Sequence, residues 1–492
     1  MAWLMTVLLM WPLLGGGVCL LLRKGASVFR WLLVAVGVQG ALTVAAARAL
    51  GMTDGARLSF GWLFMDALSA FHLALMMLVF ILSTWFALLY FCDEVRTGAL
   101  SAAAARRFGA LWCGTLFSMT LALLSNNLGM MWVGVETSTL MTAFLICVHV
   151  SPASLEAMWK YMVMCSVGVA CAFMGTLLLA ASAAGLHVPD SDVLLWTVLR
   201  QKAAGLDPNL LKLSFLFLFV GYGAKAGIAP MHNWLPDAHS QAPAPVSALF
   251  SGFLLNMAFY AILRHVAIVE AALHQSGWAL RLLMAFGCLS IVVAAAFVVF
   301  QKDVKRMLAY SSIEHIGIMA LGVGLGGWGI FGALWHIANH AVCKPLAFFS
   351  AGRLGQVYGS HHMTLIRGSL RRSPVWGIGL LGALMAITGM APFGLFMSEW
   401  VIAKAAVQHH AWWPLAVFLA GCSIVFIGIM RQAIAMAWGE PATPVEPEPP
   451  ARLMEWLVVA GMLAALLGLG LWLPDSVRLL MMKAARIVGA GI

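Results

Sequence analysis

Residues 211–230, LKLSFLFLFVGYGAKAGIAP, combine a long apolar run with two lysines, at 212 and 225, and a Gly- and Pro-rich end. A transmembrane helix needs roughly 20 predominantly apolar residues, so this stretch predicts a helix that crosses a bilayer. Lys225 stands among three glycines near the end of the run, and Pro230 removes a backbone donor one turn later. The stretch therefore predicts a transmembrane helix that is broken beside a charged residue.

Similar apolar runs occupy almost the whole chain. Of its 492 residues, 62% are hydrophobic and only 10% are charged, too few charges to cover the surface of a soluble domain. The runs are continuous and do not alternate as barrel strands do, so we expect an all-α polytopic membrane protein. About fourteen spans are predicted, with approximate cores at 3–22, 30–50, 62–91, 108–126, 129–150, 158–184, 211–229, 246–269, 278–300, 307–326, 328–352, 375–403, 412–437 and 453–473.

The formal net charge of +10 comes mostly from Lys and Arg in short loops. In a membrane protein such an excess reports topology, so no nucleic-acid partner is expected. Basic residues favour the loops after odd-numbered spans, which predicts that both termini lie outside the cytoplasm. The nine cysteines contain no CxxC pair, which argues against an iron–sulfur or zinc framework in this chain.

A short internal repeat supports an organisation in two related halves. GIAP at 227–230 resembles GMAP at 389–392, and each lies within or at the edge of an apolar run. Interrupted helices at matching positions point to an ion site. Five spans separate the two copies, and an odd number makes the repeats inverted. We expect N-terminal helices 1–3 at 1–107, a first five-helix repeat at 108–270, a second at 271–437, and a Pro/Glu-rich linker, last helix and tail at 438–492.

Two ionisable residues lie deep in predicted spans of the first half. Glu136 has about two turns of apolar residues on each side, and Lys225 lies beside the predicted break. An ionisable side chain at such depth costs several kcal/mol, which makes it a functional candidate. A Glu136–Lys225 pair about 4 Å apart would be worth roughly 4 kcal/mol, enough to switch the protonation state of a buried lysine.

A stripe of titratable residues marks the second half. His336, His340 and Lys344 recur every four residues and share one helix face. An HxxxH pair can bind zinc, but no carboxylate or third histidine is nearby in sequence and Lys344 would repel a cation. A proton relay fits better, because histidine titrates near neutral pH. Pro345 is expected to interrupt this helix directly after the stripe.

Two carboxylates complete the set of candidates. Glu399 follows the second Gly/Pro break, where it either serves the same path or marks the membrane edge. Glu314 belongs to a group of charged residues around a short loop at 302–315. We read most of that group as a solvated loop and expect Glu314 to be its buried member.

Three long motifs carry a family resemblance. They are GYGAKAGIAPMHNWLPDAHSQAPAPVSALFSG at 221–252, DVKRMLAYSSIEHIGIM at 303–319 and HIANHAVCKPLAFFSAG at 336–352. They resemble the antiporter-like proton-pumping subunits of respiratory complex I, a family that includes Mrp-type antiporter subunits and membrane subunits of energy-converting hydrogenases. LSNNLGMMWVGVETSTLMTAFL at 124–145 and SLEAMWKYMVMCSVGVA at 154–170 look closest to the group of hydrogenase 4 component F and the formate hydrogenlyase membrane subunits. The resemblance implies fourteen helices with two inverted five-helix repeats, each holding a broken helix.

The resemblance also implies roles for the candidate residues. Glu136 would be the carboxylate of the fifth helix, Lys225 its partner on the seventh, and Glu399 the exit residue of the twelfth. The central relay would be the stripe of His336, His340 and Lys344.

One position departs from the family pattern. Many relatives carry a bridging lysine in the eighth helix, and the matching residue here is Asn256. An amide does not titrate, so the link from Lys225 towards the relay depends on another group. Water, Tyr260, His265 and Glu314 are the candidates.

The expected function is proton translocation by a membrane subunit of a redox-driven respiratory or hydrogenase-type complex in the bacterial cytoplasmic membrane. No cofactor is expected in this chain; iron–sulfur clusters, a NiFe centre or quinone would belong to partner membrane and peripheral subunits. The alternatives are a subunit of a cation/proton antiporter, which would also move Na⁺, a proton-coupling subunit of an inorganic-carbon uptake complex, and a non-conducting scaffold.

Overall fold

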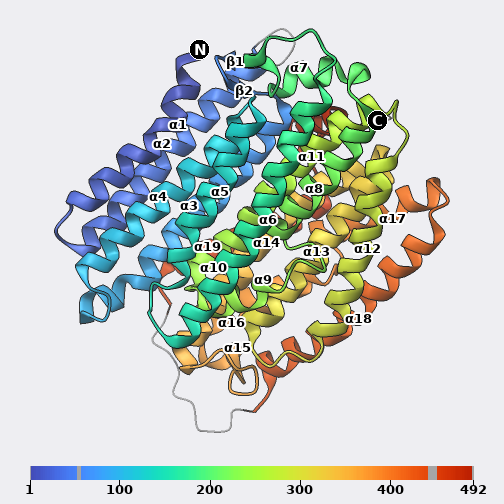
Figure 1. Ribbon diagram of the computed structural model, residues 1–492. Helices are drawn as coiled ribbons and strands as arrows, with labels where there is room; N and C mark the ends of the chain where they lie inside the picture. Colours follow the sequence, from blue (N-terminus) through green and yellow to red (C-terminus); the bar gives the residue numbers. More distant parts are fainter. Residues whose placement is uncertain (1, 53–56, 441–450, 490–492) are drawn as a thin grey trace. The chain divides into compact units, whose positions relative to one another are not determined.

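The computed structural model describes residues 2–52, 57–440 and 451–489 and consists almost entirely of helices (Figure 1). In this described part, 11 helices are long and apolar enough to cross a membrane. The predicted spans at 211–229, 328–352 and 375–403 are not among the 11, because they hold charged residues or are broken. The polytopic helical fold is confirmed, the count of fourteen stays a prediction, and the linker at 441–450 lies outside the described residues.

The chain divides into two compact units. The first comprises residues 1–227, 253–282 and 479–492. Its elements are α1 (Ala2–Leu21), α2 (Gly25–Gly51), β1 (Leu58–Phe60), β2 (Leu63–Met65), α3 (Ala67–Thr97), α4 (Ala102–Leu124), α5 (Leu128–Ile146), α6 (Pro152–Ser182), α7 (Trp196–Gln201), α8 (Pro208–Ala226), α11 (Leu255–Ala272) and most of α20 (Asp475–Val488). The strands β1 and β2 form a small antiparallel hairpin.

The second unit comprises residues 228–252 and 283–478. Its elements are α9 (Trp234–Gln241), α10 (Ala244–Leu249), most of α12 (Trp278–Val298), α13 (Val304–Leu325), α14 (Gly327–Tyr358), α15 (Ser369–Arg372), α16 (Pro374–Ile387), α17 (Gly394–Gln408), α18 (Trp412–Trp438) and α19 (Leu453–Leu471). Helix α14 packs against α10, α13, α16, α17 and α19, so it is the central helix of this unit.

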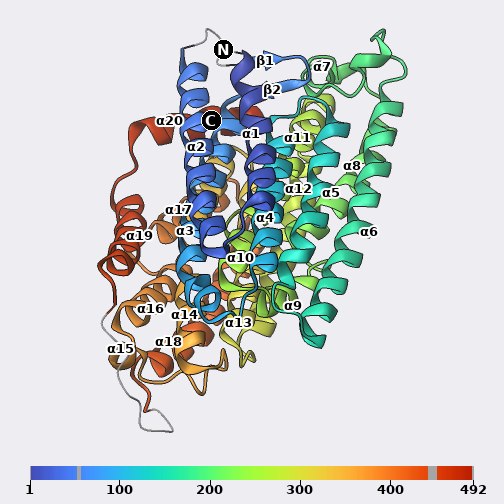
Figure 2. The ribbon, with the colours of Figure 1, turned by 90° about the vertical axis from the view of Figure 1, so that its left-hand side faces the viewer.

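Helices α6 and α8 lie side by side in the first unit (Figure 2). Small residues at the contact allow this close approach. A Cβ atom added to Gly175 of α6 would lie 2.8 Å from the backbone nitrogen of Leu218. The hydroxyl of Ser214 donates to the Gly175 carbonyl at 2.7 Å and ties the two helices together. This packing fixes α8 before its last turn, where Lys225 lies.

The chain breaks its helices at both predicted places. Helix α8 ends at Ala226, and Gly227 takes a left-handed conformation (φ 80°) before α9 begins at Trp234. Helix α16 ends at Ile387, and Gly389 (φ 65°) precedes the start of α17. Glycine takes a positive φ without steric cost, and in both places a cis peptide bond precedes the proline. The two short motifs therefore have the same backbone arrangement, and both predicted breaks are confirmed.

The predicted interruption at Pro345 is wrong. Helix α14 runs without a break from Gly327 to Tyr358, with Pro345 in its interior. Proline removes one backbone hydrogen bond, but α14 is packed on several sides, and this packing holds the helix together. The stripe of titratable residues thus lies in the middle of a long helix.

Candidate functional site

Lys225 is fully buried at the last turn of α8. Its ammonium donates to the Thr139 hydroxyl at 2.8 Å and to the Tyr161 hydroxyl at 2.6 Å. The nitrogen also lies 4.8 Å from the centroid of the Tyr161 ring, which adds a cation–π attraction. A buried charge is tolerated only where polar groups replace its water, and here α5 and α6 supply them.

The Tyr161 hydroxyl continues into a chain of hydrogen bonds. It lies 2.6 Å from the Thr142 hydroxyl, which donates to the Ser138 carbonyl at 2.6 Å. Since the Thr142 proton points to that carbonyl, Tyr161 donates to Thr142 and accepts from Lys225. The Tyr161 and Thr142 hydroxyls therefore each accept and donate in series, whereas the Ser138 carbonyl only accepts and ends the chain.

Glu136 does not form the predicted ion pair with Lys225. The Glu136 carboxylate is half-buried on α5 and accepts a hydrogen bond of 2.9 Å from Ser166. In the described part of the chain no ion pair joins it to Lys225, although the two charges are near enough to interact electrostatically. The direct contact is absent because the hydroxyls of Thr139 and Tyr161 take up the ammonium, and a pair that forms and breaks stays a prediction.

The candidate bridging residues of the first unit lie on α11. Asn256 is fully buried. His265 directs Nδ1 to the Ala261 carbonyl at 2.7 Å, and its ring stacks on Tyr222 with centroids 5.7 Å apart. The Tyr260 hydroxyl donates to the Leu123 carbonyl at 3.0 Å and accepts from Arg264 at 2.9 Å. Tyr260 is therefore committed to a different network.

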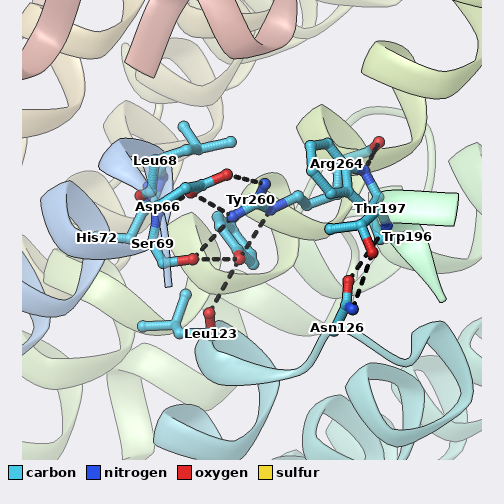
Figure 3. Close-up of polar contacts among 10 residues, drawn as sticks. All are labelled: Asp66, Leu68, Ser69, His72, Leu123, Asn126, Trp196, Thr197, Tyr260 and Arg264. Carbon is cyan, nitrogen blue, oxygen red and sulfur yellow. Dashed lines mark hydrogen bonds and ion pairs between the residues drawn. The ribbon is translucent and has the colours of Figure 1, made fainter. Parts of the chain in front are cut away.

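That network is a buried ion pair that the sequence analysis missed (Figure 3). Arg264 binds Asp66 through two hydrogen bonds, each of 2.7 Å, and also donates to Ser69 at 2.7 Å. Trp196 covers the guanidinium, whose central carbon lies 4.5 Å from the indole centroid. The sequence did contain a signal for this ion pair, because Arg264 lies inside the predicted span at 246–269.

In the second unit, the stripe on α14 lies as predicted on one continuous helix. His336, His340 and Lys344 are all fully buried. The Lys344 ammonium donates to the Leu308 carbonyl at 2.8 Å and to the Ser311 hydroxyl. These two groups belong to α13, which packs along α14.

His315 of α13 joins this stripe, although it was not among the predicted site residues. Its Nδ1 lies 2.9 Å from Nε2 of His336, whose Nδ1 lies 2.9 Å from the Ser398 hydroxyl. Ser398 donates to the Leu395 carbonyl at 2.8 Å, so it accepts from His336. His336 must then accept from His315, and Nε2 of His315 is left without a hydrogen-bond partner among the described residues. This order makes a directional chain that runs from His315 through His336 to Ser398.

Two further buried groups extend the row. The His340 ring lies 5.2 Å from that of His315. His239 of α9 stacks on Phe348 at 5.0 Å and interacts electrostatically with His340 and Lys344. Lys305 of α13 donates to the carbonyls of Ser240 and Ala242 at 2.9 and 2.5 Å, which holds the connection between α9 and α10. His239 was not predicted because no residue pattern placed it near the stripe.

The two carboxylates of this unit lie close to the histidine row. Glu314 is 3% exposed, as predicted, and interacts electrostatically with Lys344 and Glu399. Glu399 lines a cavity of about 450 Å³ between α17 and α18, together with Gly389, Cys422 and Ser423. This places Glu399 at an opening beside the second helix break.

His315, His336 and Glu399 each place a potential ligand atom within 4.8 Å of the other two. The sequence argument against a metal relied on the lack of a third histidine or carboxylate near the HxxxH pair. In the folded chain that argument does not hold, because α13 supplies His315 and α17 supplies Glu399. His336 is paired with His315 of a neighbouring helix rather than with His340 of its own.

Comparison with known proteins gives the family. Residues 125–426 match the transmembrane family of NADH:quinone oxidoreductase and Mrp antiporter subunits. The chain belongs to this family. The hydrogenase-4 component F homolog of Methylacidiphilum infernorum is 38% identical over 356 residues, which cover 72% of this chain and 74% of that protein.

Two solved structures have a similar fold. A chain of the membrane-bound sulfane sulfur reductase, an archaeal respiratory membrane complex, aligns with a TM-score of 0.86 at 22% identity and covers 98% of this chain and 97% of its own. A chain of the Mrp complex from Dietzia sp. DQ12-45-1b aligns with a TM-score of 0.84 at 19% identity, with coverages of 98% and 97%. At these identities the likeness shows the fold alone, and it agrees with the family resemblance inferred from the three sequence motifs.

Proposed function

We propose that this chain is the proton-translocating membrane subunit of a redox-driven, hydrogenase-type complex. The observation that carries the proposal is the buried row in the second unit, where His315, His336 and Ser398 form one directional hydrogen-bonded chain. Burying these titratable groups in a membrane removes their hydration at a cost in free energy, which favours a functional role for them.

The proposed transfer uses the order of donors in that chain. A proton delivered to Nε2 of His315 makes an imidazolium, which releases its Nδ1 proton to Nε2 of His336. His336 then holds a proton on both nitrogens and passes one on towards Ser398 or the nearby Glu399. Lys344 lies beside this chain, so the loss of its charge would favour protonation of the histidines and the return of its charge would favour release.

The Lys225 site would transfer protons within the first unit. Its ammonium can give up a proton through the Tyr161 hydroxyl, and the nearby carboxylate of Glu136 would accept it, so that both charged groups become neutral. Moving one elementary charge against 100 mV costs about 2.3 kcal/mol. Partner subunits that changed the electrostatic environment of Lys225 or Lys344 would supply an energy of this size.

The relatives support the finer parts of the proposal. The name of the Methylacidiphilum infernorum protein places it with hydrogenase-4, and we propose a similar multisubunit complex for this chain. Its redox cofactors, whether iron–sulfur clusters, NiFe or quinone, would lie in partner subunits. We further propose that the chain lies in the bacterial cytoplasmic membrane with both termini outside the cytoplasm. We also propose that the two five-helix repeats span residues 108–270 and 271–437.

Cation/proton antiport is the second candidate. It is favoured by the family description, which includes Mrp antiporters, and by the convergence of His315, His336 and Glu399, a ligand set that could hold a cation. In that case a gradient of Na⁺, and not electron transfer, would drive the proton.

The test is to purify the tagged chain with its partners, identify the subunits by mass spectrometry and reconstitute the complex into vesicles. Our proposal expects hydrogenase-type partners and acidification of one side on addition of the electron donor, at the same rate with and without Na⁺. Proton flux that requires Na⁺ and ignores the electron donor would establish the antiporter instead.

A further inference from the structure

A basic pocket in the first unit lies apart from the titratable groups described above. It has a volume of about 270 Å³ and is lined by Arg57, Asp66, Ala67, Trp196, Arg200, Lys483, Arg486 and Ile487. A water molecule takes about 30 Å³, so the pocket has room for a phosphate group and its neighbouring atoms. Its walls come from four places in the chain: the stretch before β1, the start of α3, α7 and α20.

The charges in this pocket do not balance. Asp66 is the one carboxylate among the lining residues, and it is fully engaged by two hydrogen bonds from Arg264 (Figure 3). Four cations remain: Arg57, Arg200, Lys483 and Arg486. In the part of the chain that the structure describes, no ion pair joins any of these four to a carboxylate. The pocket therefore carries an excess of positive charge with no counterion from its own described residues.

Arg200 shares an aromatic neighbour with a second guanidinium, that of Arg264. Its guanidinium lies 5.1 Å from the centroid of the Trp196 ring, and the same ring covers Arg264 at 4.5 Å. Burial, followed by the positive charge of Arg264, lowers the pKa of Arg200. Two guanidiniums on one indole repel each other, and an anion would relieve that repulsion.

The surroundings are those of a membrane interface. The hairpin next to Arg57 exposes Phe60 (50%) and Trp62 (38%), and aromatic side chains of this kind collect at the level of lipid headgroups. Helix α20 is amphipathic: Met481, Ala484, Ala485 and Val488 are buried, whereas Lys483 and Arg486 are exposed. Such a helix lies in the interface plane, which brings its cations to the depth of the phosphates.

We propose that this pocket binds the phosphate headgroup of an anionic phospholipid and thereby fixes α20 to α7 and the start of α3. Arginine and lysine bind phosphate through charge-assisted hydrogen bonds. The phospholipid is favoured over free phosphate because the acyl chains of a bound lipid can lie along the apolar surface next to Phe60 and Trp62. This site is independent of the proposed proton path.

The test compares two variants of the same helix in the purified, delipidated complex. In Lys483→Gln combined with Arg486→Gln, two lining cations are lost. In the control Arg478→Gln, α20 loses an exposed cation that pairs with Asp475 at 2.8 Å and does not line the pocket. Native mass spectrometry would measure retention of phosphatidylglycerol against phosphatidylcholine, and inorganic phosphate would serve as competitor.

Each basic residue near a membrane surface contributes about fivefold to the binding of anionic lipid. The double variant should therefore bind phosphatidylglycerol roughly 25-fold more weakly, whereas Arg478→Gln should match the wild type. Phosphatidylcholine should bind equally to all three. Equal retention of phosphatidylglycerol by the double variant and the wild type would overturn the proposal. Inorganic phosphate that binds the pocket as tightly as phosphatidylglycerol would also overturn it, since the site would then be one for a free anion.

Discussion

Lys225 and Lys344 are both fully buried on helices that carry the family motifs of the sequence, yet they have different neighbours. Lys225 donates to two side-chain hydroxyls, from Thr139 and Tyr161. Lys344 donates to one hydroxyl and to the backbone carbonyl of Leu308, and it interacts electrostatically with Glu314 and with neighbouring histidines.

The difference separates two ways to move a proton through a membrane. Hydroxyls relay a proton only while their hydrogen bonds stay in order, and they do not hold its charge. An imidazole nitrogen can bind a proton together with its charge, which a hydroxyl does not. We infer that the first unit transfers protons in a concerted way, whereas the second unit stores them along its row. The predictions below test this contrast, from the largest expected effect to the smallest.

Lys344→Ala should reduce electron-driven proton flux to the background leak of the vesicles. The change removes the positive charge next to Glu314, so the electrostatic effect of Lys344 on the histidine row is lost. The assay is acidification of vesicles that contain the complex, per assembled complex. Lys302→Ala, an exposed lysine of the same unit, is the matched control and should pump normally. Normal pumping by Lys344→Ala would remove it from the path.

His315→Ala should lower the flux roughly 100-fold, in the range of losing a proton-transfer group. The variant takes away the group at the head of the chain, which is the donor to His336. His409→Ala, an exposed histidine at the end of α17, should have no effect. If His315→Ala pumps as fast as this control, the directional chain has no function.

Tyr161→Phe should lower the flux roughly tenfold, because the hydroxyl that joins Lys225 to Thr142 is lost while the ring stays under the ammonium. The measurement is the same flux assay, together with its solvent isotope effect. Concerted transfer through hydroxyls predicts a larger isotope effect in the wild type than in this variant. Tyr90→Phe on α3 of the same unit is the control, and equal isotope effects in all three proteins would argue against a concerted step.

Asn256→Ala should change the flux by no more than about twofold, because an amide carries no exchangeable charge. The variant tests whether the departure from the family pattern interrupts the path. A complete loss of flux in an assembled complex would show that Asn256 orients a group or a water that the path requires.

The sequence predicted the helical membrane fold and both helix breaks because apolar length and Gly/Pro placement act locally. The stripe at His336, His340 and Lys344 was found for the same reason, since its spacing is that of a single helix. The partners of these residues were missed. Tyr161 and Thr139 have no unusual spacing, and His239 and His315 become neighbours of the stripe only through the packing of α9, α13 and α14.

The absent Glu136–Lys225 contact and the wrong prediction at Pro345 have a common origin. The Glu136–Lys225 pair and the interruption at Pro345 were both inferred from residue type without the neighbours. In the structure, neutral hydroxyls satisfy Lys225, and packing on several sides holds α14 together across its proline. Charge and backbone rules therefore located the site, whereas tertiary packing decided how its groups are connected.

The most direct test of the account is electron-driven proton pumping by a complex that carries Lys225→Ala, with Lys212→Ala on the same helix as the control. Subunit composition by mass spectrometry would establish that both variants assemble. The account predicts that Lys225→Ala transfers electrons without acidifying the vesicles, while Lys212→Ala pumps at the wild-type rate. Pumping at the wild-type rate by an assembled Lys225→Ala complex would contradict it.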